Sequence, residues 1–293
     1  MRSSGTRSFA VIASLATLAH AACNGQDALC SRPYSNVTFV GAHDSAFFGP
    51  FITQNQNINV SAQLALGVRF LQAQTHDFIG NIQMCHTSCL ELNAGPLSAF
   101  LAPVKAFLDG NPNEVVTLLL TNGDAIPVTE FASVFEAAGL TDYVFAPSGT
   151  LALDQWPTLQ TMIDDGTRLV VWMDYHANTA QVPYILDEFA YYFETPYNET
   201  VASHNFADCT IDRPAGASAD GRMGLVNHML HIEFLGIQIP DEGSADITNS
   251  PASIGAQSSV CKDLYGRAPN VVLLDYIDKG DAMAAQLALN GVQ

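Results

Sequence analysis

His43 and His86 are the residues of this sequence best placed for acid–base chemistry. Both lie near expected strand ends, and a carboxylate could orient one of them. Such a histidine pair supplies the general base and the general acid that cleave a phosphodiester without a protein nucleophile. The sequence contains no Gly-x-Ser-x-Gly, Gly-x-x-x-x-Gly-Lys or His-Glu-x-x-His motif, which disfavours serine hydrolases, P-loop enzymes and zinc peptidases.

Polar residues follow six apolar segments of the chain, each at the same end of its segment. They are His43-Asp44, then Gln72 with Gln74 and His76, Asn122, Asp174, Asn227-His228, and Asp275. In a (β/α)8 barrel the C-terminal ends of the strands converge on one mouth, where the active site lies. We therefore expect a polar substrate pocket there, lined by Gln72, Gln74, His76, Asn122, Asp174 and Asn227. The alternative is that these ends are polar only because the chain leaves the core there.

The elements that must position these residues alternate between apolar runs and stretches with helical spacing. Expected strands are Thr38–Ala42, Val68–Ala73, Val115–Leu120, Leu169–Met173, Met223–Val226 and Val271–Leu274, with shorter candidates at Tyr143–Phe145 and Tyr191–Phe193. Expected helices are Ser61–Leu66, Leu97–Leu108, Val128–Ala138 and Asp281–Leu289. The pattern predicts an α/β fold, a TIM-type (β/α)8 barrel with irregularities, in one domain.

The segment from His176 to Gly221 is rich in Asp, Asn and Pro and has weak periodicity. We expect it to be an excursion over the barrel mouth. Two further histidines, His204 and His231, are expected to have structural roles. For His228, which follows a strand end, packing against the barrel wall is the alternative to a role in the site.

Composition narrows the range of partners. The 293 residues carry 11 Lys and Arg against 29 Asp and Glu, a formal charge of −18. Such a chain repels phosphate backbones and lacks the basic clusters that bind anionic membranes. We expect no nucleic-acid partner, and a monomer.

The N-terminus matches a secretory signal. Arg2 and Arg7 precede the apolar run Phe9 to Ala19, and Ala19-His20-Ala21 fits a small-residue cleavage site. We expect residues 1–22 to be the signal and residues 23–293 the mature domain. No later segment is apolar for long enough to predict a transmembrane helix. The protein is therefore expected to be secreted and extracellular, with no integral membrane segment.

Six cysteines follow the expected signal, as in a disulfide-containing secreted protein. They allow 15 pairings. We favour Cys23 with Cys30 and Cys85 with Cys89, because these pairs are local, which leaves Cys209 with Cys261. A zinc site at Cys85-His86-Thr87-Ser88-Cys89 is an alternative, although no second Cys/His pair has finger-like spacing. Asn36, Asn59 and Asn198 lie in glycosylation sequons.

Several segments together resemble one enzyme family. Gly41-Ala42-His43-Asp44-Ser45, Gly67 to Gln74 and Met84-Cys85-His86 are similar to segments of phosphatidylinositol-specific phospholipase C X domains. The similarity extends to the strand after Pro112 and to Val272-Leu273-Leu274-Asp275. The Gln-x-Gln-Thr-His and Cys-His-Thr-Ser-Cys motifs are most similar to those of secreted fungal PLC-like phosphodiesterases.

The resemblance implies a phosphoric diester hydrolase acting on a phosphodiester or an inositol lipid. His43 would be the base, His86 the acid, and Asp275 the carboxylate beside His43. A substrate hydroxyl would attack its neighbouring phosphate and give a cyclic diester, which is then hydrolysed.

The sequence departs from the family at Gln72 and Gln74, where relatives carry acidic calcium ligands or an arginine. Phosphoryl transfer needs positive charge at the phosphate oxygens. Either Asp44, Gln72 and Gln74 hold Ca²⁺, or no cofactor is used and another residue such as His76 supplies charge. The alternative function is a catalytically weak or inactive barrel that serves as a secreted binding module. A metal enzyme like glycerophosphodiesterase or sphingomyelinase D is disfavoured, because such sites need two or three carboxylates.

Overall fold

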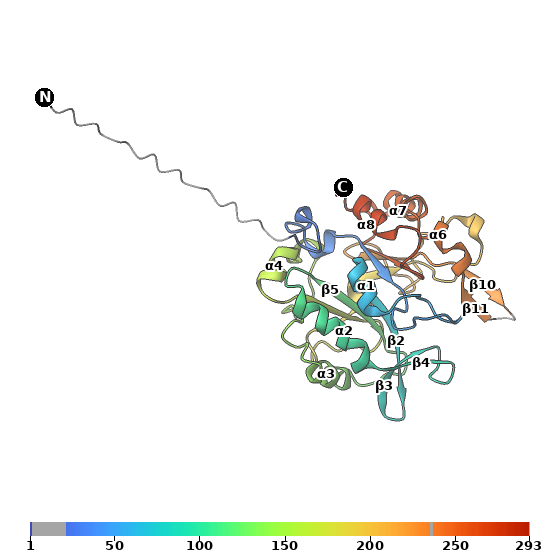
Figure 1. Ribbon diagram of the computed structural model, residues 1–293, viewed down its shortest axis with the longest axis horizontal. Helices are drawn as coiled ribbons and strands as arrows, with labels where there is room; N and C mark the ends of the chain where they lie inside the picture. Colours follow the sequence, from blue (N-terminus) through green and yellow to red (C-terminus); the bar gives the residue numbers. More distant parts are fainter. Residues whose placement is uncertain (2–21, 235–236, 293) are drawn as a thin grey trace.

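The computed structural model describes residues 1, 22–234 and 237–292 (Figure 1). The expected secretory signal at residues 1–22 therefore lies almost wholly outside the described residues. Within the described part, no helix is both long and apolar enough to cross a bilayer.

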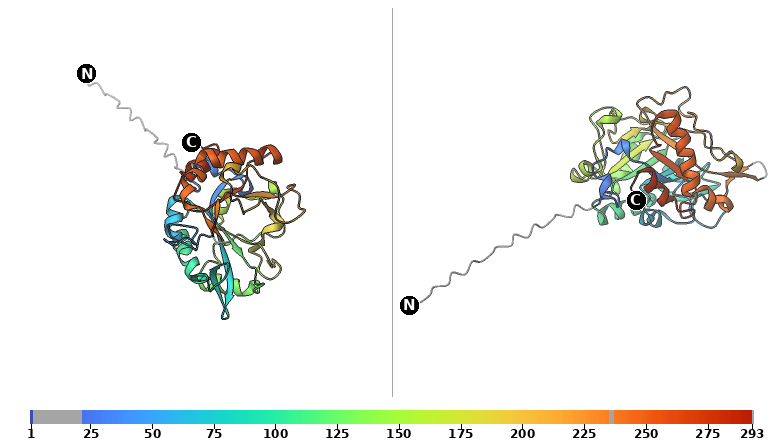
Figure 2. Two further views of the ribbon diagram at one scale, coloured as in Figure 1. Left: turned by 90° about the vertical axis from the view of Figure 1, so that its right-hand side faces the viewer. Right: turned by 90° about the horizontal axis from the view of Figure 1, so that it is seen from above.

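Parallel strands form the centre of the fold. Their order is β7-β6-β5-β2-β1-β12-β9-β8, and every neighbouring pair on this path is parallel. The bounds are β1 Phe39–Ala42, β2 Phe70–Phe78, β5 Val116–Thr121, β6 Leu169–Met173, β7 Ile185–Asp187, β8 Tyr192–Glu194, β9 Met223–Asn227 and β12 Val271–Leu274. The sheet curls into a half-barrel (Figure 2). Among the described residues β7 and β8 end the path without pairing with each other, so the TIM-type barrel is confirmed in an open form.

The eighth strand is not the one expected from the sequence. Tyr143–Phe145 forms no strand, and only Val144 makes a single bridge, to Leu169. The eighth strand of the sheet is β7 instead, which lies in the segment from His176 to Gly221 that we expected to be an excursion over the barrel mouth. That segment also contains α5 (Glu188–Tyr191) and β8. Three-residue strands show no usable periodicity, which explains the error.

Helices cover the outer face of the sheet (Figures 1 and 2). Besides α5 they are α1 Val60–Leu66, α2 Leu97–Gly110, α3 Val128–Ala137, α4 Leu159–Asp164, α6 Ala245–Thr248, α7 Pro251–Tyr265 and α8 Ala282–Leu289. Asn59 caps α1 by accepting the N–H of Ala62 at 3.0 Å, and Gly67 ends it in the left-handed conformation. The sequence did not predict α7, because its Ser- and Gly-containing stretch has little amphipathic pattern.

Two hairpins extend the barrel. The second half of β2 leaves the sheet and pairs antiparallel with β3 (Asn81–His86), which pairs with β4 (Leu92–Pro96). A separate hairpin joins β10 (His231–Phe234) and β11 (Ile237–Pro240). Short 3₁₀ turns lie at Asp27–Leu29, Tyr34–Asn36, Leu153–Gln155, Ala202–His204 and Glu242–Ser244.

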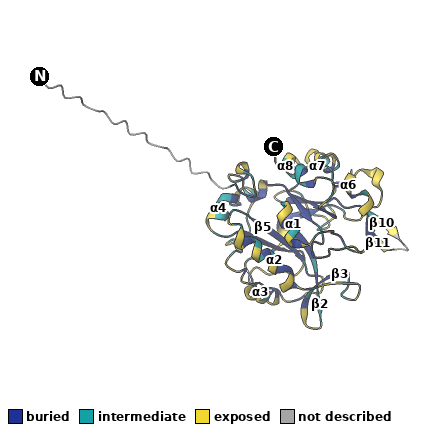
Figure 3. Ribbon diagram, viewed as in Figure 1, coloured by how far each residue is buried: buried dark blue, intermediate teal, exposed yellow. Residues whose placement is uncertain are grey.

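Strand side chains divide between two cores, because successive residues of a strand face opposite sides. On β6, Val171 packs outward against the helices, whereas Trp172 points into the barrel interior. Trp156 packs beside Trp172 with ring centroids 5.7 Å apart. The central strands are coloured as buried in Figure 3. The two cores hold the strand ends, and the side chains that follow them, in a fixed arrangement.

Three disulfides link Cys23 to Cys30, Cys85 to Cys89 and Cys209 to Cys261. The favoured pairing is therefore confirmed. The thiols of Cys85 and Cys89 are bonded to each other, so the alternative zinc site is not formed. The sequon residues Asn36, Asn59 and Asn198 are all exposed, as glycan attachment would require.

Candidate active site

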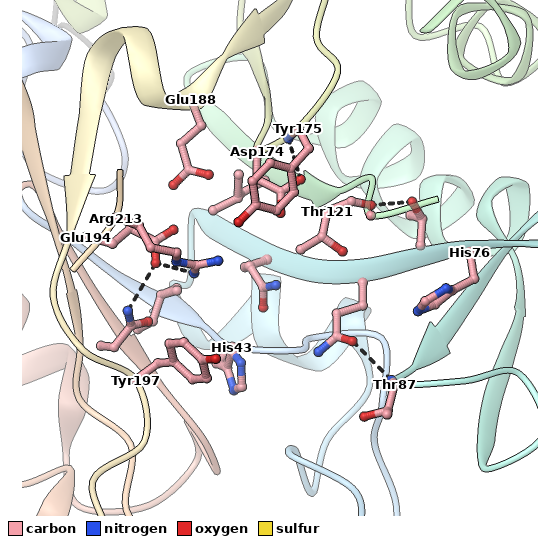
Figure 4. Close-up of a pocket in the computed structure, with 17 residues that line it drawn as sticks. His43, His76, Thr87, Thr121, Asp174, Tyr175, Glu188, Glu194, Tyr197 and Arg213 are labelled. Atoms are coloured by element: carbon pink, nitrogen blue, oxygen red, sulfur yellow. Dashed lines mark hydrogen bonds and ion pairs between the residues drawn. The ribbon is translucent and has the colours of Figure 1, made fainter. Parts of the chain in front are cut away.

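A pocket of about 400 Å³ opens at the C-terminal ends of the parallel strands (Figure 4). The expected site residues that line it are His43, Gln72, Gln74, His76, Asp174 and Asn227. The expected catalytic residues His86, Asp44 and Asp275 do not line it themselves and lie behind or beside His43. Asn122 does not line it either. Its side chain is buried and closes a turn, with Nδ2 donating to the Ile126 carbonyl at 3.0 Å and Oδ1 accepting the Ile126 N–H at 2.9 Å.

Strand register brings His43 next to Asp275. Ala42 of β1 pairs with Leu274 of β12, so the residues that follow leave the sheet side by side. His43 Nδ1 lies 2.8 Å from Asp275 Oδ1. The Asn55 side-chain amide donates to the same carboxylate oxygen at 3.0 Å. The imidazole is thereby oriented with Nε2 on the side away from Asp275, and it is 17% exposed.

Two carboxylates flank the His43 ring and change its proton affinity. His43 Nε2 lies 3.5 Å from Asp44 Oδ2. Burial lowers the pKa of His43, but the negative charges of Asp44 and Asp275 outweigh burial and raise the pKa to about 9. The ring is therefore held as an imidazolium at neutral pH in the ligand-free site.

Asp44 lies between the two histidines. Its Oδ2 is 3.2 Å from His86 Nε2 and accepts the Gln74 amide at 3.0 Å. Burial raises the pKa of this carboxyl, yet the charges and hydrogen bonds of His43 and His86 outweigh it and leave the pKa below its usual value. The backbone of Asp44 has a φ of +44°, a left-handed conformation that a turn directly after β1 imposes. An aspartate that contacts both rings holds His86 next to His43, at the edge of the pocket that His43 lines.

His86 comes from the hairpin rather than from the barrel. It ends β3, and the disulfide between Cys85 and Cys89 closes the loop that follows it. The Phe47 ring meets the imidazole edge to face, with centroids 5.4 Å apart. His86 is 27% exposed, more than His43, and so remains open to a ligand.

Gln72 and Gln74 are both committed to structural hydrogen bonds. Gln72 Oε1 accepts the Asp44 N–H at 2.7 Å, and Gln74 Oε1 accepts the Thr87 N–H at 3.1 Å. Calcium takes six to eight oxygen ligands. Among the oxygens of these three residues, Asp44 Oδ1 is the one that is buried without a hydrogen-bond partner among the described residues. The three residues that we considered as calcium ligands therefore do not fit the ion in this arrangement, and no described group of three or more His, Cys, Asp or Glu side chains could hold a metal.

Three further histidines bond to residues outside the pair, whereas His231 lies close enough for the charges of His43 and His86 to add to burial in lowering its pKa. His76 lines the pocket rim, where Nδ1 is 3.1 Å from Asp124. His228 is fully buried, with Nε2 2.8 Å from the Thr248 carbonyl, and burial lowers its pKa. His204 pairs with Glu199 on the surface. The chain thus gathers two of its histidines around one carboxylate.

Several pocket residues were not expected from the sequence: Tyr175, Glu188, Glu194, Tyr197 and Arg213. All come from the segment that links β6 to β9, and Figure 4 shows them around the upper and left walls of the pocket. Arg213 and Glu194 form an ion pair, and Asn227 Nδ2 donates to Glu194 Oε2 at 3.2 Å. A signal for some of them was available in the sequence. Met173 and Glu194 end strands, and the polar residues at these two ends could have been assigned to the mouth of the barrel.

The curled parallel sheet with a polar mouth at the C-terminal strand ends places the protein in the class of TIM-type barrels. The structure resembles phosphatidylinositol-specific phospholipase C from Listeria monocytogenes, with a TM-score of 0.59 at 16% identity over 89% of this chain and 95% of that one. It also resembles a Staphylococcus aureus enzyme of the same name, with a TM-score of 0.61 at 13% identity over 89% and 94%. These likenesses establish the fold.

Sequence comparison identifies the family. The profile described as PI-PLC X 1 matches residues 29–290. "PI-PLC X domain-containing protein 1" of Arthroderma benhamiae is 49% identical over 96% of this chain and 93% of its own length. An "Uncharacterized secreted protein" of the same fungus is 43% identical over 88% of this chain and 61% of its own length. The chain belongs to the PI-PLC X family.

Proposed function

We propose that the protein is a phosphoric diester hydrolase of the phosphatidylinositol phospholipase C type. The single observation that carries the proposal is the arrangement of His43, bonded to Asp275, and His86 around Asp44, beside the pocket that His43 lines. Acid–base cleavage needs two groups that exchange protons with atoms on either side of the same phosphorus. The Nε2 atoms of both rings face the same carboxylate oxygen and so can serve one bound phosphate.

In the first step, His43 Nε2 takes the proton of a substrate hydroxyl next to the phosphate. The freed oxygen attacks phosphorus, the bond to the leaving alcohol breaks, and His86 Nε2 gives its proton to that alcohol. A cyclic diester results. In the second step water attacks the cyclic diester, with His86 taking the proton of the water and His43 returning its own to the departing oxygen.

Asp275 determines which nitrogen of His43 exchanges a proton with the substrate. It holds the Nδ1–H of His43, so Nε2 is the nitrogen that exchanges the substrate proton. It also favours the imidazolium that forms when His43 accepts this proton. With a pKa of about 9, only about one His43 in 100 is neutral at pH 7, so the limb of the kcat/KM profile that reports the base should lie near pH 9.

We propose that the reaction needs no metal, because both glutamine amide oxygens already accept backbone N–H groups. Positive charge at the phosphate would then come from protonated His86 at the start of the attack and from His43 once it has accepted the substrate proton. His76 and Arg213 line the same pocket, but each is already paired with a carboxylate.

The pairing of Arg213 with Glu194 also supports the second candidate, a barrel that binds a ligand without turning it over. In that case the pocket would hold a polar molecule while lacking a free cation for the transition state.

The test is hydrolysis of phosphatidylinositol and of inositol cyclic 1,2-phosphate by the purified protein, with calcium and with EDTA. We expect turnover that is unchanged by EDTA and is lost in His43→Ala and in His86→Ala. His204→Ala, a surface histidine outside the pocket, is the matched control and should keep full activity. Turnover that persists in His43→Ala contradicts the assignment of His43 as the base. If the unmutated protein shows no turnover, the binding module is favoured.

We also propose that the protein is secreted as a monomer. The three disulfides and the relative called a secreted protein support export. N-terminal sequencing of protein from culture medium should begin near residue 22, and light scattering should give the mass of one chain.

A further inference from the structure

The pocket wall formed by the segment between β6 and β9 carries more carboxyl groups than cations. Asp174, Glu188 and Glu194 face the pocket, and Figure 4 shows the Glu188 carboxyl extending into it. Arg213 is the one lysine or arginine among the described residues that line it. The mechanism proposed above uses none of these four residues.

Arg213 is not available to balance all three acids. Its guanidinium is paired with Glu194, which also accepts the Asn227 amide at 3.2 Å. The guanidinium also lies 5.3 Å from the centre of the Tyr197 ring. These contacts hold the guanidinium at one side of the wall. Arg213 is thus paired with Glu194, and Glu188 and Asp174 have no ion-pair partner among the described residues that line the pocket.

Glu188 is the unusual member of the wall. It is 1% exposed, and its carboxyl oxygens have no donor among the described residues other than the neighbouring carboxyl of Glu194. A buried carboxyl that faces only another acid is costly, which marks a place where a ligand is expected to supply a donor. Asp174 lies in the same wall, and its Oδ1 accepts the N–H groups of Asn122 and Tyr175 at 2.8 and 2.7 Å.

Both acids hold protons more tightly than usual in the empty pocket. Burial raises the pKa of Asp174 to about 6, although its backbone hydrogen bonds act in the opposite direction. Burial, followed by the neighbouring charge of Glu194, raises the pKa of Glu188 well above its ordinary value. A positively charged ligand would favour the ionised carboxylates and displace these protons, whereas a negatively charged ligand would be repelled by whichever of the acids is ionised.

We propose that this wall binds an ammonium group carried by the substrate, with Glu188 and Asp174 as its carboxylate partners. The exposed ring of Tyr175, at 42%, lies beside them and offers a face to the same cation. The substrate would therefore be a phosphodiester with an amine-bearing substituent, and substituents with additional phosphates would be excluded. This inference rests on the proposed function for the diester itself, but the ammonium site can be tested by binding alone.

Three glycerophosphodiesters serve as probes, because they share the same phosphate and the same vicinal glycerol hydroxyl. Glycerophosphoethanolamine carries the amine, glycerophosphoglycerol is neutral at that position, and glycerophosphoinositol 4-phosphate carries a further phosphate. Binding is measured by titration calorimetry on His43→Ala protein, to prevent turnover, and by competition in the unmutated protein. We expect the amine diester to bind at least about tenfold tighter than the neutral one, and the phosphorylated one to bind weakest.

Glu188→Gln should reduce the preference for the amine to about twofold or less, because it removes the charge and keeps the size of the side chain. Glu130→Gln, on the exposed face of α3, is the matched control and should leave the preference unchanged. Titration in buffers of different ionisation enthalpy should also show protons released when the amine binds at neutral pH.

The proposal is overturned if the amine and neutral diesters bind equally well, or if the amine diester does not bind. The comparison of the three probes on the unmutated protein decides this even if Glu188→Gln does not fold. A preference that persists in folded Glu188→Gln also overturns it. The proposed function fails separately: selective binding of the amine diester without hydrolysis of any diester would retain the ammonium site and refute the hydrolase.

Discussion

Replacing Asp275 with asparagine removes one charge from the His43 site and leaves its shape nearly intact. Asp275 Oδ1 is 2.8 Å from His43 Nδ1 and also accepts the Asn55 amide at 3.0 Å. An asparagine oxygen could keep one of these contacts. If its amide nitrogen faced His43 instead, the ring would be fixed in the wrong tautomer.

The size of the effect follows from this contact. A hydrogen bond between charged groups contributes about 1.5–3 kcal/mol, and one pKa unit corresponds to about 1.4 kcal/mol. The pKa of His43, about 9 with both carboxylates present, should therefore fall by about one to two units. Loss of the oriented base should slow the reaction by about 10²- to 10⁴-fold.

The assay is the pH dependence of kcat/KM on phosphatidylinositol, joined to an NMR titration of the His43 ring. We expect the rising limb of the Asp275→Asn profile to move toward lower pH as the maximum rate falls. Asp109→Asn, an exposed aspartate paired with Lys105, is the matched control. A profile whose limb stays in place, with a rate within about twofold of the unmutated protein, would refute the reasoning.

Two further predictions concern stability. The pKa of His43 is raised from 6.5 to about 9 by folding, so its contribution is fully present below about pH 6.5 and is lost as pH rises through about 9. Urea denaturation should show a loss of up to about 3 kcal/mol across this window, and a smaller loss in His43→Ala. Removing the disulfide of Cys85 and Cys89, by alanine at both positions, should lower activity at least about tenfold by freeing the loop after His86, yet cost only about 2 kcal/mol of stability. Removing that of Cys209 and Cys261, 52 residues apart, should cost about 4 kcal/mol with less effect on kcat. Equal effects of the two removals on activity would show that the Cys85 loop does not position the acid.

The barrel and one side of its mouth could be predicted from the sequence. The apolar runs that become β1, β2, β5, β6, β9 and β12 are four or more residues long, which is enough to distinguish them from helices. Parallel strands align their C-terminal ends, so residues such as His43 and Asp275 could be placed together before any distance was known. Their contact depends on the register of β1 with β12, which only the structure supplies.

The other side of the mouth could not be predicted in the same way. Glu188 and Glu194 flank elements of three or four residues, and Arg213 lies on a loop, where no periodic signal marks direction or partner. The roles of Gln72 and Gln74 could not be predicted from the sequence either. Their residue type allowed metal ligation, and only the geometry shows their oxygens bonded to backbone N–H groups.

Phosphorus-31 NMR of a running reaction tests the central claim most directly. With phosphatidylinositol as substrate, a cyclic inositol phosphodiester should appear first and then convert to the monoester, because the substrate's own hydroxyl attacks before water does. Both signals should be absent with His43→Ala. A monoester that forms from the start, with no cyclic diester at any time and no hydrolysis of added cyclic diester, would contradict the assignment of His43 and His86 as an acid–base pair for intramolecular attack.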